Sequence, residues 1–433
     1  MEKKYKDSGI EWIGKIPEEW NVMQIRRIMR NRSERNQPNA MVLSLYRDLG
    51  IVPKDSRDDN HNVTSEDTAS YKVVSKGNFV INKMKAWQGS MAVSEYDGIV
   101  SPAYYVCTFT RKVYKRYFHY LLRDASYKPE YLRLSTGMRI GQWDLNIDDF
   151  LRIKAIFPPV PEQQNIANYL DEKCVEIDSL IGLQEQMIEK LKAYKQSVIT
   201  EVVTNGIAPG VKLVPSGTDW ISEIPKGWKV KPFKELFRTG KGLSFTKADL
   251  VNEGIPVISY GQVHSKQNTG TRIDDVLVRF ISDDIAKGGE SSKVKVGDFI
   301  FADTSEDLSG CGNCVYVDRE IGLYAGYHSV IAFSKRNESN AYLAYLFLTD
   351  CWRSQIRCRV SGIKVFSISQ SIIKQTSIIL PPEDEQNSIV SYLDEKCADI
   401  DRLIALKQRK IESLKDYKKS VIFEAVTGKT IIE

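Results

Sequence analysis

The sequence predicts an α+β fold with a pseudo-two-fold internal repeat, in which two globular mixed α/β domains are separated by two long antiparallel coiled-coil helices. Two pairs of repeated blocks predict it: a short motif rich in tryptophan and proline, and a longer block of helical character. Between these blocks lie two middle segments, residues 23–157 and 231–380, that resemble each other only faintly. A duplicated frame with two divergent segments suits a protein that recognises two different things in a fixed relation.

The short motif stands near the start of each half of the chain. Residues 8–22 read SGIEWIGKIPEEWNV, and residues 216–230 read SGTDWISEIPKGWKV. Both tryptophans and the Ile-Pro pair recur 208 residues later. The longer block recurs after 223 residues, so the second middle segment is 15 residues longer than the first.

The longer block predicts a helix in each copy. Residues 158–205 read PPVPEQQNIANYLDEKCVEIDSLIGLQEQMIEKLKAYKQSVITEVVTN, and residues 381–428 read PPEDEQNSIVSYLDEKCADIDRLIALKQRKIESLKDYKKSVIFEAVTG. Pro-Pro followed by Glu-Gln is typical of the beginning of a helix, because proline ends the preceding segment and acidic side chains favour the first turn. A helix of about 40 residues would be about 60 Å long, at 1.5 Å per residue.

Apolar residues recur at intervals of seven along both blocks, which is typical of a coiled coil. The predicted seam consists of Leu170, Ile177, Leu191 and Val198 in the first copy and Leu393, Ile400, Leu414 and Val421 in the second. We expect a second row on the same face at Leu180, Met187, Tyr194, Leu403 and Tyr417. Gln184 and Lys407 interrupt the seam at matching positions, as polar residues that fix coiled-coil register do. Because the two seams are copies, each helix is the natural antiparallel partner of the other.

The middle segments are predicted to be mixed α/β. Short apolar or alternating stretches between turn residues indicate strands at 77–82, 103–108, 255–260, 298–302 and 328–333. Helices are expected at 115–124 and 341–353. The predicted boundaries are a first domain at 1–157, a central helical region at 158–206, a second domain at 207–380 and a C-terminal helical region at 381–433.

The composition is that of an ordinary globular chain, with 42% hydrophobic residues, 27% charged residues and a formal net charge of +5. No run approaches the roughly 20 apolar residues of a membrane span. No apolar region of a secretory signal follows the first charged residues. The expected location is therefore cytoplasmic, without a membrane partner. Positive charge is concentrated in residues 26–35 and 351–374, which favours contact with phosphates.

The sequence predicts no catalytic residues and no metal site in this chain. Residues 428–430 resemble the end of a phosphate loop, but Phe423 stands where the first glycine must be. Residues 171–173 and their copy at 394–396 are interpreted as solvated helix charges or as contacts to a partner. The seven cysteines are scattered and do not indicate a disulfide framework. Ordinary buried thiols are the favoured interpretation, and the alternative is a zinc site built from Cys311, Cys314, Cys351 and Cys358.

The order of these motifs resembles one known family, the specificity subunits of type I restriction–modification systems. That order is a tryptophan- and proline-rich motif, a variable domain, PP-x-x-EQ, a YLDEK helix that continues into LK-x-YK-x-SVI, V-T-N or V-T-G, and then all of it again. The resemblance covers nearly the whole chain and is most specific in the duplicated helix. The stretches 77–81, 83–89 and 98–102 also look like one version of the family's target-recognition domain.

The resemblance implies that the chain is a non-catalytic DNA-recognition subunit. Each variable domain would read one half of a bipartite, asymmetric site in double-stranded DNA, and the antiparallel helices would set the spacer between the halves. Two modification subunits would dock on the helices and methylate an adenine in each half at N6 with S-adenosylmethionine. Two restriction subunits would join them for cleavage that uses ATP and Mg. This chain would bind no cofactor of its own.

Candidate DNA contacts follow from the chemistry of base edges, since Arg and Lys suit guanine, Asn and Gln suit adenine, and phosphates accept any cation. The candidates in the first domain are Lys83, Lys85, Trp87, Gln88, Arg139 and Gln142. The candidates in the second are Lys241, Ser244, Tyr260, Gln262, Thr304, Arg359 and Lys364. Arg139 and Lys364 rank first, because a Thr/Ser-Gly-x-basic loop precedes the helical block in both halves. The alternative is core packing for each aromatic residue and a solvated position for each lone lysine.

Two other functions stay open on the sequence alone. A stand-alone DNA-binding regulator would use the same two reading domains without a methyltransferase. An adaptor would bind protein partners through the domains, with the basic stretches incidental. The duplicated frame disfavours both, because two equivalent helical faces indicate two copies of some partner.

Overall fold

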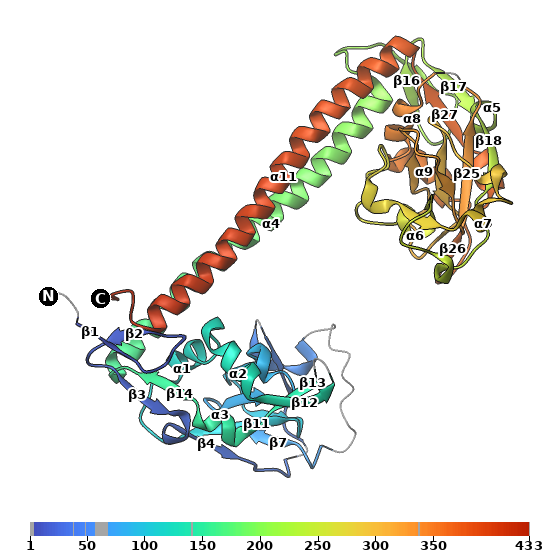
Figure 1. The fold of residues 1–433 in the computed structure, drawn as a ribbon. Helices are drawn as coiled ribbons and strands as arrows, with labels where there is room; N and C mark the ends of the chain where they lie inside the picture. The colour runs from blue at the N-terminus through green and yellow to red at the C-terminus, as the bar shows by residue number, and fades with distance from the viewer. Residues whose placement is uncertain are drawn as a thin grey trace. The chain divides into compact units, whose positions relative to one another are not determined.

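The computed structural model describes residues 4–37, 39–47, 49–56, 68–139, 142–336 and 338–432, without the side chains of Met138, Arg139 and Gln142. The chain divides into two compact units. Unit 1 comprises Met1–Gln186 with Lys407–Glu433, and unit 2 comprises Met187–Leu406. Each unit therefore holds one mixed α/β domain and a part of both long helices (Figure 1).

The two predicted long helices are confirmed. Helix α4 is Val160–Asn205, with 46 residues, and helix α11 is Glu383–Val426, with 44. Both begin directly after the Pro-Pro pair. The glutamine of each Glu-Gln pair donates its Nε2–H to the first proline carbonyl, Gln163 to Pro158 and Gln386 to Pro381, both at 2.8 Å. The repeated motif thus satisfies a carbonyl just before the helix and fixes the point where the chain turns into it.

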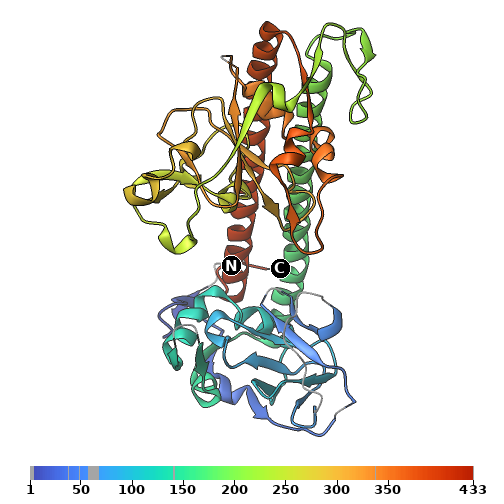
Figure 2. The ribbon, with the colours of Figure 1, turned by 90° about the vertical axis from the view of Figure 1, so that its right-hand side faces the viewer.

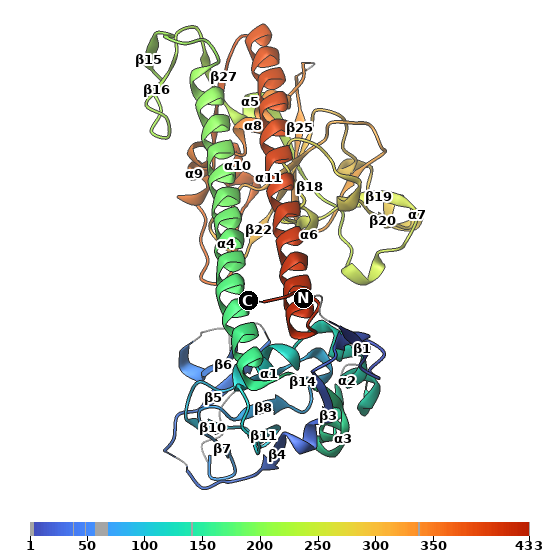
Figure 3. The ribbon, with the colours of Figure 1, turned by 90° about the vertical axis from the view of Figure 1, so that its left-hand side faces the viewer.

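The two helices run antiparallel in each unit, as predicted. In unit 1, Lys418 Nζ lies 2.7 Å from the carboxylate of Asp178. In unit 2, Lys195 Nζ lies 2.7 Å from the carboxylate of Asp401. In each unit an early residue of one helix faces a late residue of the other, and the helices lie side by side (Figures 1 and 3). Asp178 recurs 223 positions later as Asp401, and Lys195 recurs as Lys418, so the two ion pairs are copies related by the internal repeat.

The predicted seam is confirmed in one of its two rows. Its buried members are Leu170, Ile177, Val198, Leu393, Ile400, Leu414 and Val421, and its half-buried members are Gln184, Leu191 and Lys407. The second row was wrong, because its members stay exposed: Leu180, Met187, Tyr194, Leu403 and Tyr417. Their place is taken by residues four positions after the first row: Cys174, Ile181, Ile188, Cys397 and Ile411. Residues three and four positions along an α-helix lie on nearly the same side, and both rows are apolar here, so periodicity alone could not separate them.

The domain of unit 1 is built from antiparallel sheets and short helices. Its four-stranded sheet has the order β4 (Met29–Arg32), β11 (Tyr104–Phe109), β8 (Phe79–Asn82), β9 (Met91–Val93). Its two-stranded sheets are β1 (Tyr5–Asp7) with β2 (Lys15–Pro17), β3 (Asn21–Gln24) with β14 (Lys154–Phe157), β5 (Leu43–Tyr46) with β6 (Gly50–Pro53), β7 (Lys72–Val74) with β10 (Gly98–Val100), and β12 (Ser135–Arg139) with β13 (Gln142–Leu145). Its helices are η1 (Ile25–Arg27), η2 (Lys54–Ser56), η3 (Ala86–Gln88), α1 (Lys115–Leu121), η4 (Ala125–Tyr127), α2 (Lys128–Leu134) and α3 (Ile147–Arg152).

The domain of unit 2 repeats this plan with additions. Its four-stranded sheet has the order β18 (Phe237–Lys241), β25 (Ser329–Ser334), β21 (Phe299–Ala302), β23 (Cys314–Tyr316). Its other sheets are β20 (Arg279–Ile281) with β19 (Ile255–Ile258) and β24 (Tyr324–Ala325), β15 (Leu213–Pro215) with β16 (Glu223–Pro225), β17 (Lys229–Pro232) with β27 (Ser377–Leu380), and β22 (Thr304–Ser305) with β26 (Phe366–Ser367). Its helices are α5 (Phe233–Leu236), η5 (Lys247–Asp249), α6 (Tyr260–Val263), η6 (Asp275–Leu277), α7 (Asp283–Ala286), η7 (Glu290–Ser292), α8 (Ala341–Leu346), α9 (Asp350–Arg357) and α10 (Gln370–Lys374).

Two predicted elements differ in the structure. The helix expected at 341–353 is divided into α8 and α9, because the Thr349 side chain accepts a hydrogen bond from the backbone N–H of Trp352 and caps a new helix. The strand expected at 255–260 ends at Ile258. There the Ser259 side chain begins α6 in a reciprocal capping arrangement with Gln262.

The internal repeat extends into the middle segments despite their weak sequence similarity. Both four-stranded sheets place their strands in the same order, and β8 and β21 carry the related Gly-x-Phe stretches at 77–81 and 297–301. In unit 2, the sheet, α8 and α4 share one buried cluster, which contains Phe299, Leu343 and Val198 (Figures 1 and 2). Among the described residues, no helix has the length and apolar content that a membrane crossing requires.

Each domain binds the long helices through the repeated motifs. Trp20 donates its indole N–H to Glu162 at 2.8 Å in unit 1, and Trp228 donates to Glu385 at 2.9 Å in unit 2. The repeated tryptophan and the glutamate of PP-x-x-EQ are therefore partners, which explains why both recur in each half of the chain.

The aspartate of YLDEK also serves the domain. In unit 1, Asp171 accepts a hydrogen bond from Tyr120 and pairs with Arg116 at 2.8 Å. In unit 2, Asp394 accepts from Tyr345 and pairs with Arg272 at 2.8 Å. This aspartate is therefore more than a solvated helix charge, because it has hydrogen-bond and ion-pair partners in its own unit.

A further tyrosine in each unit binds the C-terminal end of a long helix, α11 in unit 1 and α4 in unit 2. Tyr117 donates its hydroxyl proton to the Val426 carbonyl, and Tyr342 donates to the Val203 carbonyl, both at 2.9 Å. Carbonyls in the last turn of a helix have no partner within the helix, so these bonds satisfy groups that would otherwise be buried without one. Burial raises the pKa of Tyr342 well above its usual range, so the hydroxyl keeps the proton that it donates.

Replacing Tyr342 by Phe should lower the free energy of unfolding of unit 2 by about 1–2 kcal/mol. The ring packing is retained, but the fully buried Val203 carbonyl loses its donor. Urea denaturation followed by tryptophan fluorescence would measure the change. Tyr392→Phe, at a tyrosine of α11 that is 38% exposed, is the matched control and should have no effect. Equal stability of both variants would contradict the structural role of this bond.

Candidate nucleic-acid interface

Four of the residues predicted to contact DNA in the first domain lie on one turn between β8 and β9. Asn82 accepts a hydrogen bond from the Met84 backbone N–H at 3.1 Å and shapes the start of the turn. Gly89, with a φ of 82°, ends helix η3 in the left-handed conformation that glycine adopts most easily. The turn therefore presents its predicted contacts together: Lys83, Lys85, Trp87 and Gln88.

The hairpin β12–β13 supports this turn. The rings of Trp87 and Trp143 meet edge to face, with their centroids 5.1 Å apart. Lys83 Nζ lies 3.6 Å from the carboxylate of Asp144. The turn and the hairpin thus form one surface, although they are far apart in the sequence. The hairpin also contains Arg139 and Gln142, whose backbones pair with each other, but their side chains lie outside the described part of the structure.

Positive charge from other elements gathers beside this turn. Burial lowers the pKa of Lys72, and the nearby cations Arg35 and Lys83 lower it further. The exposed Arg47 donates a hydrogen bond to the side-chain oxygen of Gln88. The sequence did not predict that Arg35, Lys72 and Arg47 lie near this turn, because strand pairing brings them there. Such a concentration of cations attracts a polyanion.

In the second domain, two predicted residues border a hollow of about 920 Å³. Tyr260 and Thr304 line it. The remaining lining residues come from several elements: Gln196, Gly261, His264, Ser305, Glu306, Asp307, Ser309, Gly310, Asn313, His328, Leu348, Asp350, Arg353, Arg357 and Val365. Polar groups with both donors and acceptors therefore dominate the surface around these two residues.

A hydrogen-bonded chain orders one wall of this hollow. Asn313 donates its amide N–H to His264 Nδ1 at 3.1 Å, so His264 Nε2 carries the proton and donates it to the Thr304 carbonyl at 2.8 Å. The ring of Tyr260 meets that of His328 edge to face at 5.5 Å. His328 has a φ of 52° and is held 3.3 Å from the carboxylate of Asp303. The sequence did not identify either histidine, since no spacing pattern joins them.

The loop that holds Lys364 lies next to Thr304. Strand β26 pairs with β22, with Ser367 opposite Thr304. Lys364 itself is exposed in the loop that precedes β26. Arg359 is also exposed, and its guanidinium donates to the Gln355 carbonyl at the end of α9. The structure thus brings Thr304, Arg359 and Lys364 to one side of the domain.

The other predicted residues of the second domain, Lys241, Ser244 and Gln262, differ in how free their side chains are to contact DNA. Lys241 and Ser244 are exposed at and after the end of β18, and the Lys241 carbonyl accepts a hydrogen bond from Ser292. Gln262 uses its side-chain oxygen to accept the Ser259 backbone N–H at 3.1 Å. That oxygen is therefore occupied by helix capping.

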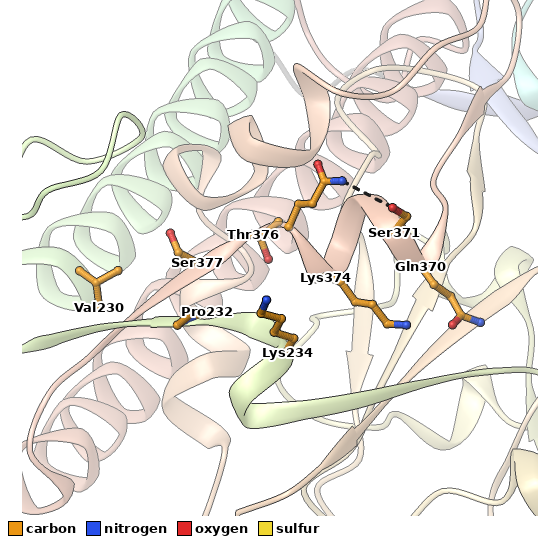
Figure 4. Close-up of a pocket in the computed structure, with 9 residues that line it drawn as sticks. Val230, Pro232, Lys234, Gln370, Ser371, Lys374, Thr376 and Ser377 are labelled. Carbon is orange, nitrogen blue, oxygen red and sulfur yellow. Dashed lines mark hydrogen bonds between the residues drawn. The ribbon is translucent and has the colours of Figure 1, made fainter.

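A second hollow of about 900 Å³ lies at the edge of β17 and α10 (Figure 4). Exposed lysines from two elements border it, Lys234 of α5 and Lys374 of α10. Gln370 on its rim is held by Thr239, which donates to it at 2.7 Å. No acidic residue is among those that line this hollow, so its charge is suited to a phosphate rather than to a base edge.

The alternative of a zinc site finds no support in the geometry. Cys311 and Cys314 are buried, and burial raises the pKa of Cys314 to about 12. Within the described residues, no group of three or more His, Cys, Asp or Glu side chains is placed to hold a metal ion.

Comparison with known proteins bears on both halves of the chain. Residues 17–193 and residues 225–416 each match the family described as type I restriction modification DNA specificity domain. The specificity subunit of the type I restriction enzyme MjaVIII from Methanocaldococcus jannaschii is 25% identical over 314 residues, which cover 72% of this chain and 69% of that protein. The specificity subunit of EcoKI from Escherichia coli (strain K12) is 22% identical over 390 residues, which cover 88% and 78%.

Two solved structures share the fold. A chain from a structure of complex assembly and conformational transition in the type I R-M system has a TM-score of 0.70 and 14% identity, with 96% of this chain and 99% of that chain covered. The HsdS subunit from Thermoanaerobacter tengcongensis has a TM-score of 0.52 and 15% identity, with 96% and 98% covered.

Proposed function

Because the chain belongs to the family of type I restriction–modification DNA specificity proteins, we propose that its two domains each read one half of a split, asymmetric site in double-stranded DNA. The chain supplies recognition and performs no chemistry. Two modification subunits that use S-adenosylmethionine bind it and methylate one adenine in each half at N6. Two restriction subunits, which use ATP and Mg, join this complex for cleavage.

One observation carries this proposal. The two units hold domains of the same sheet order on matching helix positions by the same bonds, whereas the surface side chains of the domains differ. Identical attachment with different reading surfaces is what recognition of two unlike half-sites requires. A stand-alone regulator would not need two equivalent helical faces.

The test is co-expression of this chain with its modification subunit, followed by mapping of methylated adenines across the host genome. We expect one split motif with one methylated adenine in each half. A stable complex that produces no new methylation would favour the regulator or the adaptor, and a direct DNA-binding measurement would then decide between them.

Lys364→Ala in the same experiment should assign the second domain to its half-site. If Lys364 reads a base, its loss should cost about 1–3 kcal/mol and relax the sequence preference in that half alone. Lys247→Ala, another lysine exposed in the second domain, serves as the control.

The modification subunits are proposed to bind the exposed row on the long helices. In unit 1 this patch consists of Leu180, Leu183 and Tyr417, and in unit 2 it consists of Leu403, Leu406 and Tyr194. The members of one patch correspond to those of the other by the 223-residue repeat. Since Asp178 faces Lys418, Leu180 and Tyr417 lie within about one turn of each other along the antiparallel pair. Two equal apolar patches suit two copies of one partner.

A further inference from the structure

One loop of unit 2 exposes an aliphatic side chain almost completely. Ile363 is 99% exposed, whereas the other large apolar residues noted as exposed in the described chain reach at most 70%. Val365, two positions later, is 52% exposed and lines the hollow beside Tyr260 and Thr304. An isoleucine held in water forgoes about 1.5–3 kcal/mol of burial energy, which contact with a partner would recover.

The loop is built to keep this side chain extended. Ser361 and Ser367 form a bridge at its base, and the Ser367 N–H donates to the Ser361 carbonyl at 3.3 Å. Gly362 has a φ of 150°, and a Cβ there would lie 2.0 Å from the Val365 carbonyl oxygen, so only glycine fits. Strand β26 then joins the loop to β22. The base of the tip is therefore defined by contacts within the domain itself.

The neighbours of Ile363 fit DNA better than they fit a protein. A protein interface buries a core of several apolar side chains inside a polar rim. Here the exposed Lys364 follows Ile363 directly, and Arg359 is exposed at the start of the loop. Among the residues that the structure describes, the free cations of this loop are Arg359 and Lys364, since Arg357 pairs with Asp350 at 2.8 Å. A single aliphatic tip between cations matches a major groove, where phosphates flank the one apolar group on a base edge, the 5-methyl group of thymine.

We propose that Ile363 reads a thymine by contact with its 5-methyl group in the half-site that the second domain recognises. This inference rests on the proposed function and names one residue that determines specificity within it. Lys364 then neutralises a neighbouring phosphate or contacts an adjacent base. Each half contains at least one A·T pair, because each contains a methylated adenine.

The experiment replaces each thymine of both half-sites, one at a time, by uracil, which lacks only the methyl group. Binding of each duplex to the complex of this chain with its modification subunits is then measured. One position in one half should show about fourfold weaker binding, since burial of one methyl group is worth about that factor. In the Ile363→Ala complex the thymine duplex should bind as weakly as the uracil duplex, and the two should no longer differ.

Two control variants isolate the effect. Lys364→Ala should bind more weakly overall but keep the difference between thymine and uracil. Ile431→Ala, at an isoleucine of unit 1 that is 59% exposed, should behave as the parent protein. The inference is overturned if no position distinguishes thymine from uracil, if Ile363→Ala retains the difference, or if Ile363→Ala impairs subunit assembly instead. Failure of the parent complex to bind any split site would instead refute the proposed function, and the inference with it.

Discussion

Inserting four residues into each long helix should lengthen the gap of the recognised DNA site by one to two base pairs. The insertions duplicate residues 187–190 in α4 and 410–413 in α11. Four residues add about 6 Å and about 40° of rotation to a helix. One to two base pairs add about 3.4–7 Å and about 34–70° to DNA in the same right-handed sense. The added length and the added rotation of the helices therefore both correspond to the same change in the DNA gap. The two half-sequences should stay the same.

The insertion points preserve the pairing within each unit. The ion pair of Asp178 with Lys418 belongs to unit 1, and that of Asp401 with Lys195 belongs to unit 2. Both insertions fall between these pairs along the helices and correspond to each other by the 223-residue repeat, so neither pair changes partner. A four-residue insertion is a stutter, which coiled coils accommodate by local unwinding.

Mapping of methylated adenines reads out the gap directly. The control inserts the same four residues between Ala208 and Pro209, in the exposed segment after α4, and should leave the gap unchanged. A constant gap with altered half-sequences in the helix variant would contradict the role of the helices as a spacer.

The internal repeat made the two long helices predictable. Which of two adjacent apolar residues is buried between them was not predictable. A spacing of seven identified Leu170 and Ile177 without knowledge of the partner helix. Leu180 and Ile181 are both apolar and adjacent, and only the partner decides which of them is buried. The helix carries more apolar residues than one seam needs, and the excess is what forms the exposed patches.

Contacts between distant segments could not be predicted from the sequence for a different reason. Trp20 and Glu162 both lie in repeated motifs, but nothing in the sequence joins them across 142 residues. The candidate contacts at 83–88 could be named from the sequence because they lie together in one short stretch. Arg47 and Lys72 reach the same surface only through strand pairing, which one sequence does not reveal. The break at Thr349 was readable in principle, since a threonine followed by aspartate is a helix-capping signal.

Replacing an apolar residue in either helical patch by aspartate should remove one modification subunit from the complex. Leu180→Asp should abolish binding at the patch of unit 1, and Leu403→Asp should abolish it at the patch of unit 2. Both leucines are partly exposed, at 42% and 46%, so the isolated chain should tolerate the change. A buried, unpaired carboxylate at an interface opposes association strongly, and we expect affinity to fall on the order of 100-fold or more at the altered patch.

Native mass spectrometry of the purified complexes counts the subunits. Each single variant should bind one modification subunit, and the Leu180→Asp/Leu403→Asp double variant should bind none. Val175→Asp is the matched control: it places the same charge on α4 at a residue that is 70% exposed and lies about 140° around the helix from Leu180. Its complex should retain two modification subunits. If the double variant also retains two modification subunits, the partner binds another surface. The exposed row would then only reflect that each helix has more apolar residues than its seam can bury.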